Sequence, residues 1–252
     1  MTQQLPVAVL GANGRMGAEA VKAVEAAPDM KLVAALGRGD SLDSLLESGA
    51  RYVVDLTVPE STEENVRFAV ENGMHAVVGT TGWDLGRLES LETLLAGHPE
   101  VGVLIAPNFA LGSVLTSAFA AKASKYFESV EIIELHHPDK VDAPSGTAVR
   151  TAQLVAAERE AAGIGPSPDA TTTELAGARG CEVDGVRVHS VRLRGLVAHQ
   201  EVLLGGPGEQ LTLRHDSFDR ASFMPGVLLG VRNVAAHPGL TVGLDGYLDL
   251  GL

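Results

Sequence analysis

Short apolar runs alternate with amphipathic segments over the first hundred residues. An apolar run at 7–10 is followed by a helical pattern that stops at Pro28, and a second apolar run spans 31–36. The alternation then repeats, with predicted strands at 52–57, 75–78 and 101–106 and predicted helices at 60–71 and 85–95. This order is typical of a parallel sheet covered by helices. We therefore expect ligands at the carboxyl ends of these strands.

The pattern changes after residue 109. A predicted helix at 110–126 leads to a β-rich run at 130–135, and a further helix follows and ends near Gly163. Strand-like runs then follow without intervening helices at 186–193, 197–204 and 210–215, and a helical pattern returns at 221–235. Strands joined by short turns favour an antiparallel arrangement. We expect a second domain here, with the last residues, through Asp249 and Leu250, returning to the first.

The first strand and first helix are joined by a glycine-rich turn, GANGRMG at 11–17. Glycine permits a tight turn and lets a pyrophosphate approach the backbone at the helix N-terminus. Strand, glycine-rich turn, helix and strand within about 30 residues is the opening unit of a dinucleotide-binding fold. The spacing is G-x-x-G-x-x-G rather than G-x-G-x-x-G, so a tight turn without a ligand is the alternative. The predicted fold class is α/β: a Rossmann-type parallel-sheet domain plus a second mixed α/β domain with an open, largely antiparallel sheet.

The loops after three strands, at 57–59, 79–81 and 106–109, are expected to line the nicotinamide-ribose side of the cofactor. In this fold, the adenosine ribose is recognised at the end of the second strand, about 20 residues past the glycines. An NAD site usually has an acid there, whereas this chain has Gly37-Arg38-Gly39. Arg38 can pair with a 2′-phosphate, and Asp40 partly offsets this. NADPH is therefore expected over NADH, the alternative being that Arg38 is a solvated loop residue.

Most of the candidate chemistry lies in one stretch, ELHHPDKVDAPSGTA at 134–148. It contains His136, His137, Lys140 and a Ser145-Gly146-Thr147 sequence that opens a helix. Ser145 is a natural N-cap, and a helix N-terminus carries about half a positive charge that favours carboxylate or phosphate. A capped helix with surface histidines is the alternative. A metal site is not expected, because adjacent residues on a strand point to opposite faces and no closing ligand is evident.

Composition and charge narrow the classes of protein to which the chain can belong. The 252 residues are 45% hydrophobic and 20% charged, which is a globular composition. A net charge of −13 argues against a nucleic-acid partner. No apolar run approaches the roughly 18 residues of a membrane span, and the N-terminus lacks the basic region of a signal peptide. Cys181 is the one cysteine, which excludes an intramolecular disulfide and favours a cytoplasmic location.

Four motifs together resemble the dihydrodipicolinate reductase (4-hydroxy-tetrahydrodipicolinate reductase) family of bacterial lysine and diaminopimelate synthesis. They are GANGRMG, VVGTTG, IAPNFALG and ELHHPDKVDAPSGTA. The last is highly specific, whereas the glycine motif is shared with many dehydrogenases. The resemblance runs through nearly the whole chain. It implies a dinucleotide-binding domain at 1–107 and 217–252, and a substrate-binding domain at 108–216 that builds a homotetramer through its open sheet.

The resemblance also implies roles for individual residues. His136 would be the general acid, Lys140 a substrate-binding and proton-donating partner, and His137 a substrate contact. Ser145, Gly146 and Thr147 would hold a substrate carboxylate. The cofactor would be contacted by Gly11, Ala12, Asn13, Gly14, Arg15 and Met16, by Gly79, Thr80 and Thr81, and by Ala106, Pro107, Asn108 and Phe109. Many family members carry an acid where this chain has Gly37, and those acids support the use of NADH. The resemblance therefore implies use of both NADPH and NADH less strongly for this chain.

The expected reaction reduces a small cyclic imine-type dicarboxylate. Hydride from the nicotinamide adds to an electron-poor ring carbon, and an imidazolium is a good proton donor near neutral pH. Two alternatives stay open: another NAD(P)-dependent oxidoreductase, and a non-catalytic nucleotide-sensing module. The remaining histidines are assigned no role at this stage: His75, His98, His189, His199, His215 and His237.

Overall fold

The computed structural model of the protein describes residues 4–248 and 250, and it divides into two compact units. The first unit comprises the described residues of Met1–Ala110 and Arg220–Leu250, and the second comprises Leu111–Asp219. The first part of this unit ends at residue 110, whereas the predicted boundary was 107. Its second part begins at residue 220, whereas the predicted boundary was 217. The expected return of the chain end to this unit includes Asp249 and residues 251–252, which lie outside the described residues.

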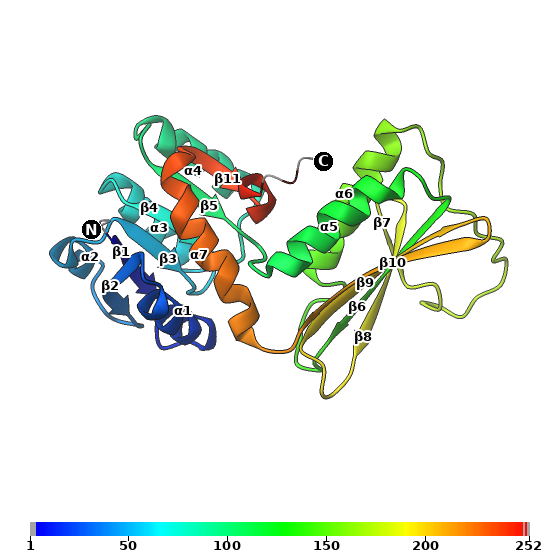
Figure 1. The fold of residues 1–252 in the computed structure, drawn as a ribbon, viewed down its shortest axis with the longest axis horizontal. Helices are drawn as coiled ribbons and strands as arrows, with labels where there is room; N and C mark the ends of the chain where they lie inside the picture. The colour runs from blue at the N-terminus through cyan, green and yellow to red at the C-terminus, as the bar shows by residue number, and fades with distance from the viewer. Residues whose placement is uncertain (1–3, 249, 251–252) are drawn as a thin grey trace. The chain divides into compact units, whose positions relative to one another are not determined.

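The first unit contains a six-stranded sheet whose strand order is β11-β5-β4-β3-β1-β2 (Figure 1). Every strand pairs in parallel with its neighbour. The strands are β1 (Leu5–Leu10), β2 (Met30–Leu36), β3 (Tyr52–Asp55), β4 (His75–Val78), β5 (Gly102–Ile105) and β11 (Gly239–Val242). This sheet confirms the Rossmann-type part of the predicted fold class.

The register of the central strands brings their carboxyl ends to one edge. Leu10 of β1 pairs with Asp55 of β3, Asp55 with Val78 of β4, and Val78 with Ile105 of β5. Each of these four residues is the last residue of its strand. The loops that follow β1, β3, β4 and β5 therefore begin side by side, which is the arrangement that the sequence predicted.

Helices cover the parallel sheet because its strands are apolar on both faces. Helix α1 contacts α7, and α3 contacts α4, so the helices pack in pairs. The buried cluster beneath α3 and α4 includes Val66, Leu91 and Val78, whereas Val77 is also fully buried and points the other way. The helices are α1 (Arg15–Ala26), α2 (Asp43–Ser48), α3 (Thr62–Glu71), α4 (Leu85–Ala96) and α7 (Met224–Asn233), with 3-10 turns η1 (Arg220–Phe223), η2 (Val234–Ala236) and η3 (Leu244–Tyr247).

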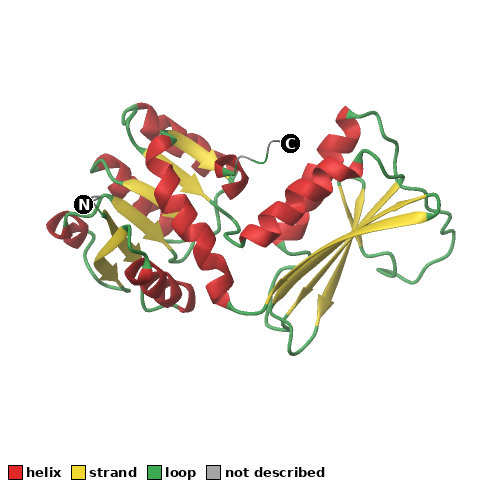
Figure 2. Cartoon of the chain, viewed as in Figure 1, coloured by secondary structure: helices red, strands yellow, loops and turns green. Residues whose placement is uncertain are grey.

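The second unit contains a second sheet, which is drawn in yellow beside its two helices in Figure 2. It has five strands in the order β10-β9-β6-β8-β7. The β6–β8 pair is parallel and the other three pairs are antiparallel, which confirms the mixed, largely antiparallel sheet predicted here. The strands are β6 (Ser129–His136), β7 (Cys181–Val183), β8 (Val186–Arg192), β9 (Ala198–Gly206) and β10 (Glu209–Ser217), and the helices are α5 (Leu111–Ser124) and α6 (Gly146–Ala161).

Both helices of the second unit pack on the same face of its sheet. Ala120 of α5 and Val155 of α6 share one buried cluster with Val130 and Ile132 of β6. The alternate residues of β6, such as Ile133, are only half-buried. Within 111–219, all of which is described, α5 and α6 are the only helices, so this unit places no helix on the opposite face. The sheet is open on one side, as expected.

Candidate active site

The turn between β1 and α1 is packed by backbone atoms. Gly11 has a φ of +76°, in the left-handed region that favours glycine. A Cβ atom at Gly11 would lie 2.5 Å from the carbonyl oxygen of Leu56, and a Cβ atom at Gly17 would lie 2.0 Å from that of Gly11. Neither position admits a side chain without moving the backbone. The close turn presents the N-terminus of α1 at the sheet edge, where an anion binds favourably.

A cavity of about 740 Å³ lies beside this turn in the first unit. Its volume is in the range of roughly 300–1,000 Å³ that small-molecule and cofactor sites occupy. Four of the predicted cofactor residues line it: Gly11, Asn13, Gly14 and Arg38. Ala12 and Arg15 are not among its lining residues. Ala12 is buried, and its N–H donates to the carbonyl oxygen of Leu36 at 3.0 Å, so its contribution is to fix the turn.

The lining of this cavity includes a cation and an acid, Arg38 and Asp40. Arg38 is exposed, and Asp40 folds back so that its Oδ2 accepts the Gly37 N–H at 2.7 Å. Both residues line the cavity. A Cβ atom at Gly37 would lie 2.3 Å from Nδ2 of Asn13, so a larger residue there would have to move the Asn13 side chain. A carboxylate thus lies next to position 37, although the residue at that position is glycine.

A second cavity, of about 240 Å³, lies at the carboxyl ends of β3, β4 and β5. It brings together the following predicted cofactor residues: Met16, Gly79, Thr80, Thr81, Ala106, Pro107, Asn108 and Phe109. Thr57 and Pro59 join them, as does Phe223, which sequence reasoning did not select. A Cβ atom at Gly79 would lie 2.7 Å from side-chain carbons of both Leu56 and Phe109. The glycine therefore allows these two side chains to pack against the loop.

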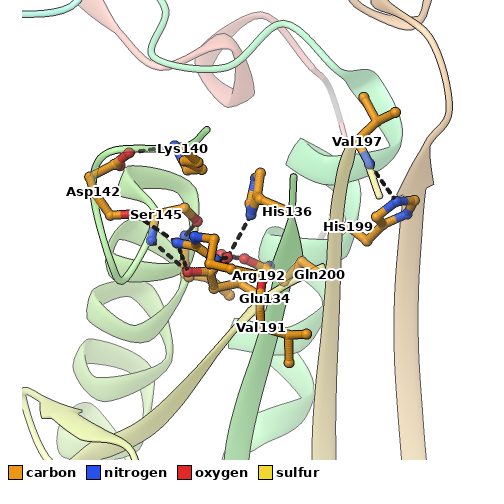
Figure 3. A network of polar contacts seen from close by, with 12 residues as sticks. Glu134, His136, Lys140, Asp142, Ser145, Val191, Arg192, Val197, His199 and Gln200 are labelled. Atoms are coloured by element: carbon orange, nitrogen blue, oxygen red, sulfur yellow. Dashed lines mark hydrogen bonds and ion pairs between the residues drawn. The ribbon is translucent and has the colours of Figure 1, made fainter. Parts of the chain in front are cut away.

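In the second unit, Glu134 is the centre of a polar network at the end of β6 (Figure 3). Its side chain is fully buried, with 0% exposed. Arg192 donates to both carboxylate oxygens, at 2.8 and 2.7 Å, and the Ser145 N–H donates at 3.1 Å. Nδ1 of His136 lies 2.5 Å from Oε2 of the same carboxylate. One side chain thus joins β6, β8 and the start of α6.

The protonation of this network follows from its contacts. Burial by itself would raise the pKa of Glu134, but hydrogen bonds from His136, Arg192 and Ser190 hold that pKa at about 2. An ionised carboxylate only accepts hydrogen bonds, so Nδ1 of His136 must carry the proton that is shared with Glu134. Nε2 is then the ring nitrogen left to exchange a proton with a ligand. The His136 side chain remains 13% exposed.

Hydrogen bonds to Asp142 fix the loop between His136 and Ser145. Lys140 places Nζ 2.7 Å from Oδ1 of Asp142, and Arg192 donates to the Asp142 carbonyl oxygen at 2.7 Å. Burial alone would raise the pKa of Asp142, but the hydrogen bond from Lys140 lowers it. The Lys140 side chain is 22% exposed. Its ammonium group is therefore held at the same end of the sheet as His136, as Figure 3 shows.

Ser145 caps α6 as the sequence predicted. Its Oγ accepts the Ala148 N–H at 3.2 Å, and its backbone is extended. Gly146 begins the helix, and a Cβ atom there would meet nothing within 4 Å, so packing inside the chain does not require glycine. Thr147 follows in the first turn, which carries the positive end of the helix dipole.

Sequence reasoning missed the residues that hold this site together, Glu134 and Arg192. Glu134 occupies an apolar position of β6, in line with Val130 and Ile132, and a charged residue in that pattern was the available signal. Arg192 pairs in register with His136 across β6 and β8, which the sequence does not show. His136 and His137 do not occupy opposite faces of a strand, contrary to the expectation from the sequence, because β6 ends at His136 and His137 begins the loop.

Another histidine, His199, was assigned no role and proves to be highly connected. Its Nδ1 lies 2.7 Å from Oδ1 of Asp216, and its Nε2 accepts the Val197 N–H at 3.1 Å. It thereby fixes the start of β9, beside β6. In the part of the chain that the structure describes, no group of three or more His, Cys, Asp or Glu residues is arranged to hold a metal ion.

Comparison with known families covers both units. The model for the dihydrodipicolinate reductase N-terminus matches residues 5–109, and the model for the C-terminus matches residues 112–248. The chain belongs to the dihydrodipicolinate reductase family. A 4-hydroxy-tetrahydrodipicolinate reductase of Streptomyces griseus is 66% identical over 98% of this chain and 99% of that protein. One from Corynebacterium diphtheriae is 55% identical over 98% of this chain and 99% of that protein.

Solved structures agree with this family. Dipicolinate-bound dihydrodipicolinate reductase from Paenisporosarcina sp. TG-14 matches with a TM-score of 0.88 at 39% identity, over 98% of this chain and 100% of that chain. A scyllo-inositol dehydrogenase from Lactobacillus casei matches with a TM-score of 0.59 at 10% identity, over 98% and 93% of the two chains, which shows a shared fold alone.

Membership of the reductase family makes the chain an oxidoreductase that uses a nicotinamide cofactor. The first unit fits such a cofactor, because its glycine turn has no room for a Cβ atom and two cavities follow the sheet edge. No helix among the described residues combines the length and apolar character needed to cross a membrane.

Proposed function

We propose that this chain reduces 4-hydroxy-tetrahydrodipicolinate to tetrahydrodipicolinate with NADPH or NADH as the hydride donor. The hydroxyl group leaves as water, which gives dihydrodipicolinate, and the hydride and a proton then add to that compound. The main support for this proposal is the hydrogen-bond network of Glu134. This network fixes the protonation pattern of His136 and connects the histidine to the N-terminus of α6. The relatives that share most of this chain are named for that reaction. The proposal assigns the cofactor to the first unit and the substrate to the second.

The second unit offers positive groups for a dicarboxylate. Lys140 contributes an ammonium group, and the first turn of α6, at Ser145, Gly146 and Thr147, contributes the positive end of a helix dipole. We assign the substrate carboxylate to this turn and to Lys140, with His137 as a further contact. In a chain with a net charge of −13, these groups provide the local attraction that an anionic substrate requires.

Proton transfer is assigned to His136. A nicotinamide held by the first unit would supply the hydride for the substrate ring. His136 delivers a proton from Nε2 to the atom that gains electron density, while Nδ1 keeps its hydrogen bond to Glu134. Glu134 stays ionised and stabilises the positive charge on the ring before transfer. Lys140 assists as a second donor. Positioned acid catalysis of this kind contributes typically about 10²–10⁴-fold.

We propose NADPH as the preferred cofactor, with NADH as a second. Arg38 is an exposed guanidinium in the lining of the larger cavity. We assign the adenosine ribose to this part of the cavity, where Arg38 can pair with a 2′-phosphate. Asp40 also lines this cavity and disfavours that phosphate, so the preference reflects a balance between the two residues. The remaining cofactor contacts are assigned to the glycine turn at 11–16 and to the loops at 79–81 and 106–109.

The cellular setting is also a proposal. We assign the reaction to lysine and diaminopimelate synthesis, as the resemblance to this family implies. A single cysteine in 252 residues supports a cytoplasmic location. The face of the second sheet that carries no helix of its own unit supports assembly into a homotetramer. The acidic net charge of −13 supports the absence of a nucleic-acid partner.

The test is the loss of reduced-nicotinamide absorbance. The substrate is generated in place from pyruvate and aspartate semialdehyde by the preceding aldolase-type synthase, and NADPH and NADH are run side by side. Rapid oxidation that favours NADPH supports the reaction and the assignment of Arg38. Equal rates keep the reaction and reject that assignment. Oxidation of neither cofactor, with the synthase shown to be active, rejects the reaction in favour of another oxidoreductase or a nucleotide-sensing module.

A further inference from the structure

A second buried carboxyl group, that of Asp55, lies in the first unit at the carboxyl end of β3. Its residue is fully buried, with 0% exposed. Oδ1 accepts hydrogen bonds from the Thr57 N–H at 2.9 Å, from Thr57 Oγ1 at 2.6 Å and from Thr80 Oγ1 at 3.0 Å. Oδ2 accepts from Thr62 Oγ1 at 3.0 Å and from Asn65 Nδ2 at 3.1 Å. The loops that follow β3 and β4 and the first turn of α3 are thus all hydrogen-bonded to the Asp55 side chain.

These contacts fix the direction of two hydroxyl groups. A threonine hydroxyl has one proton to donate and two lone pairs with which to accept. Thr57 and Thr80 both direct their proton toward Asp55. Thr57 Oγ1 also accepts from Asn65 Nδ2 at 3.2 Å. Toward any ligand, these hydroxyl groups therefore act as acceptors.

The two hydroxyl groups belong to the cofactor cavities, whereas Asp55 does not. Thr57 and Thr80 line the cavity of about 240 Å³, and Thr57 also lines the larger one of about 740 Å³. Neither Asp55 nor Thr62 lines either cavity. Asp55 can therefore affect a ligand only through the residues that it holds.

We infer that Asp55 is a positioning residue that sets the polarity of the nicotinamide end of the cofactor site. Acceptor-only oxygens at Thr57 and Thr80 match a donor such as a ribose hydroxyl, and they disfavour phosphate oxygens, which are also acceptors. The phosphates are thereby directed to the glycine turn and the N-terminus of α1. The inference rests on the proposed use of a nicotinamide dinucleotide, and it adds the residue that orients this ligand along the sheet edge.

The experiment compares two ligands by calorimetry on the full chain. Asp55→Asn keeps the size of the side chain and replaces one acceptor oxygen with a donor. We expect the Kd for NADPH to rise roughly tenfold, as loss of one or two well-placed hydrogen bonds would cause. The Kd for 2′,5′-ADP, which lacks the nicotinamide ribose, should stay within about twofold. Equal weakening of both ligands, or no weakening of either, overturns the inference.

Two further variants separate positioning from folding. Thr80→Val removes one oriented hydroxyl and should reproduce the selective loss of NADPH affinity, so it carries the test if Asp55→Asn does not fold. Thr62→Val removes a donor to Asp55 outside both cavities, and it should lower the Tm while leaving both Kd values unchanged. Unchanged NADPH affinity in Thr80→Val contradicts the inference. Failure of the unaltered protein to bind NADPH or NADH would instead reject the proposed function.

Discussion

Nδ1 of His136 lies 2.5 Å from Oε2 of Glu134, whose side chain is fully buried and bound at both oxygens by Arg192. The contact fixes which ring nitrogen holds a proton and how the ring is turned. The same carboxylate accepts the Ser145 N–H, so the orientation of the ring and the position of the α6 N-terminus are set together. A change at Glu134 should therefore affect catalysis without any direct contact with the substrate.

Glu134→Gln should lower kcat by about 10²-fold or more, because an amide that replaces the orienting carboxylate can hold the wrong tautomer of the histidine. Steady-state kinetics with saturating NADPH measures this effect. The Kd for NADPH should not change, since Glu134 belongs to the second unit. A kcat within about threefold of the unaltered protein would contradict the orienting role.

The pH dependence of stability should also reflect Glu134. Its pKa in the folded protein is lowered from 4.5 to about 2, so its stabilising contribution is complete above pH 4.5 and is lost as the pH falls toward 2. The contribution is on the order of 3 kcal/mol for a shift of this size. Urea unfolding of the unaltered protein and Glu134→Gln at pH 7 and pH 3 measures it. The difference in unfolding free energy should shrink at pH 3, and a constant difference would refute this account.

His136→Gln should lower kcat by about 10²–10⁴-fold, with little change in the affinity for NADPH, because it removes the proton donor alone. His98→Gln serves as a control, since His98 belongs to the first unit and is assigned no role. Turnover and cofactor titration are measured for both variants. Near-normal turnover in His136→Gln would contradict the assignment of His136 as the general acid.

Lys140→Ala should raise the KM for the substrate by roughly 10- to 100-fold, as loss of a hydrogen bond to a charged group predicts. The KM for NADPH should stay constant, because Lys140 lies in the second unit. Initial rates at varied substrate concentration measure the change. If only kcat fell and the substrate KM did not move, Lys140 would not bind the substrate carboxylate.

Arg38→Ala should weaken NADPH selectively. Loss of a charge-assisted contact with the 2′-phosphate should raise the KM for NADPH about tenfold and leave the KM for NADH nearly unchanged. The ratio of kcat/KM for the two cofactors is the measurement. An equal effect on both cofactors would show that Arg38 does not distinguish them. Asp40→Asn should shift the same ratio in the opposite direction, toward NADPH, because it removes the opposing acid.

Much of the fold was predictable because its signals are local. The glycine turn, the apolar strands and the Ser145 cap each depend on a few consecutive residues, and the structure has them at or near the expected positions. Strand β11, at Gly239–Val242, was not predicted. Four residues between Pro238 and Gly243 give little periodicity, and the strand depends on pairing with β5, more than 130 residues earlier in the chain.

The candidate site was predictable only in part, for a related reason. His136, Lys140 and Ser145 fall in one stretch, so the sequence groups them. Arg192 reaches Glu134 because β6 and β8 pair in parallel, a register that depends on the whole second sheet. The sequence indicated Asp40 as an acid near Arg38, but it could not show that the Asp40 carboxylate returns to the Gly37 N–H, because that return is a loop conformation rather than a pattern.

The division of the first unit between two parts of the chain has a consequence during synthesis. Residues 111–219 emerge from the ribosome before α7 and β11, which complete the parallel sheet and cover it with Val227 and Val231. The second unit has a contiguous sequence and can begin to fold while the first still lacks a strand and a helix. In the nascent chain, a partly uncovered apolar sheet face thus precedes the native protein, and this interval is when aggregation or chaperone capture is most favoured.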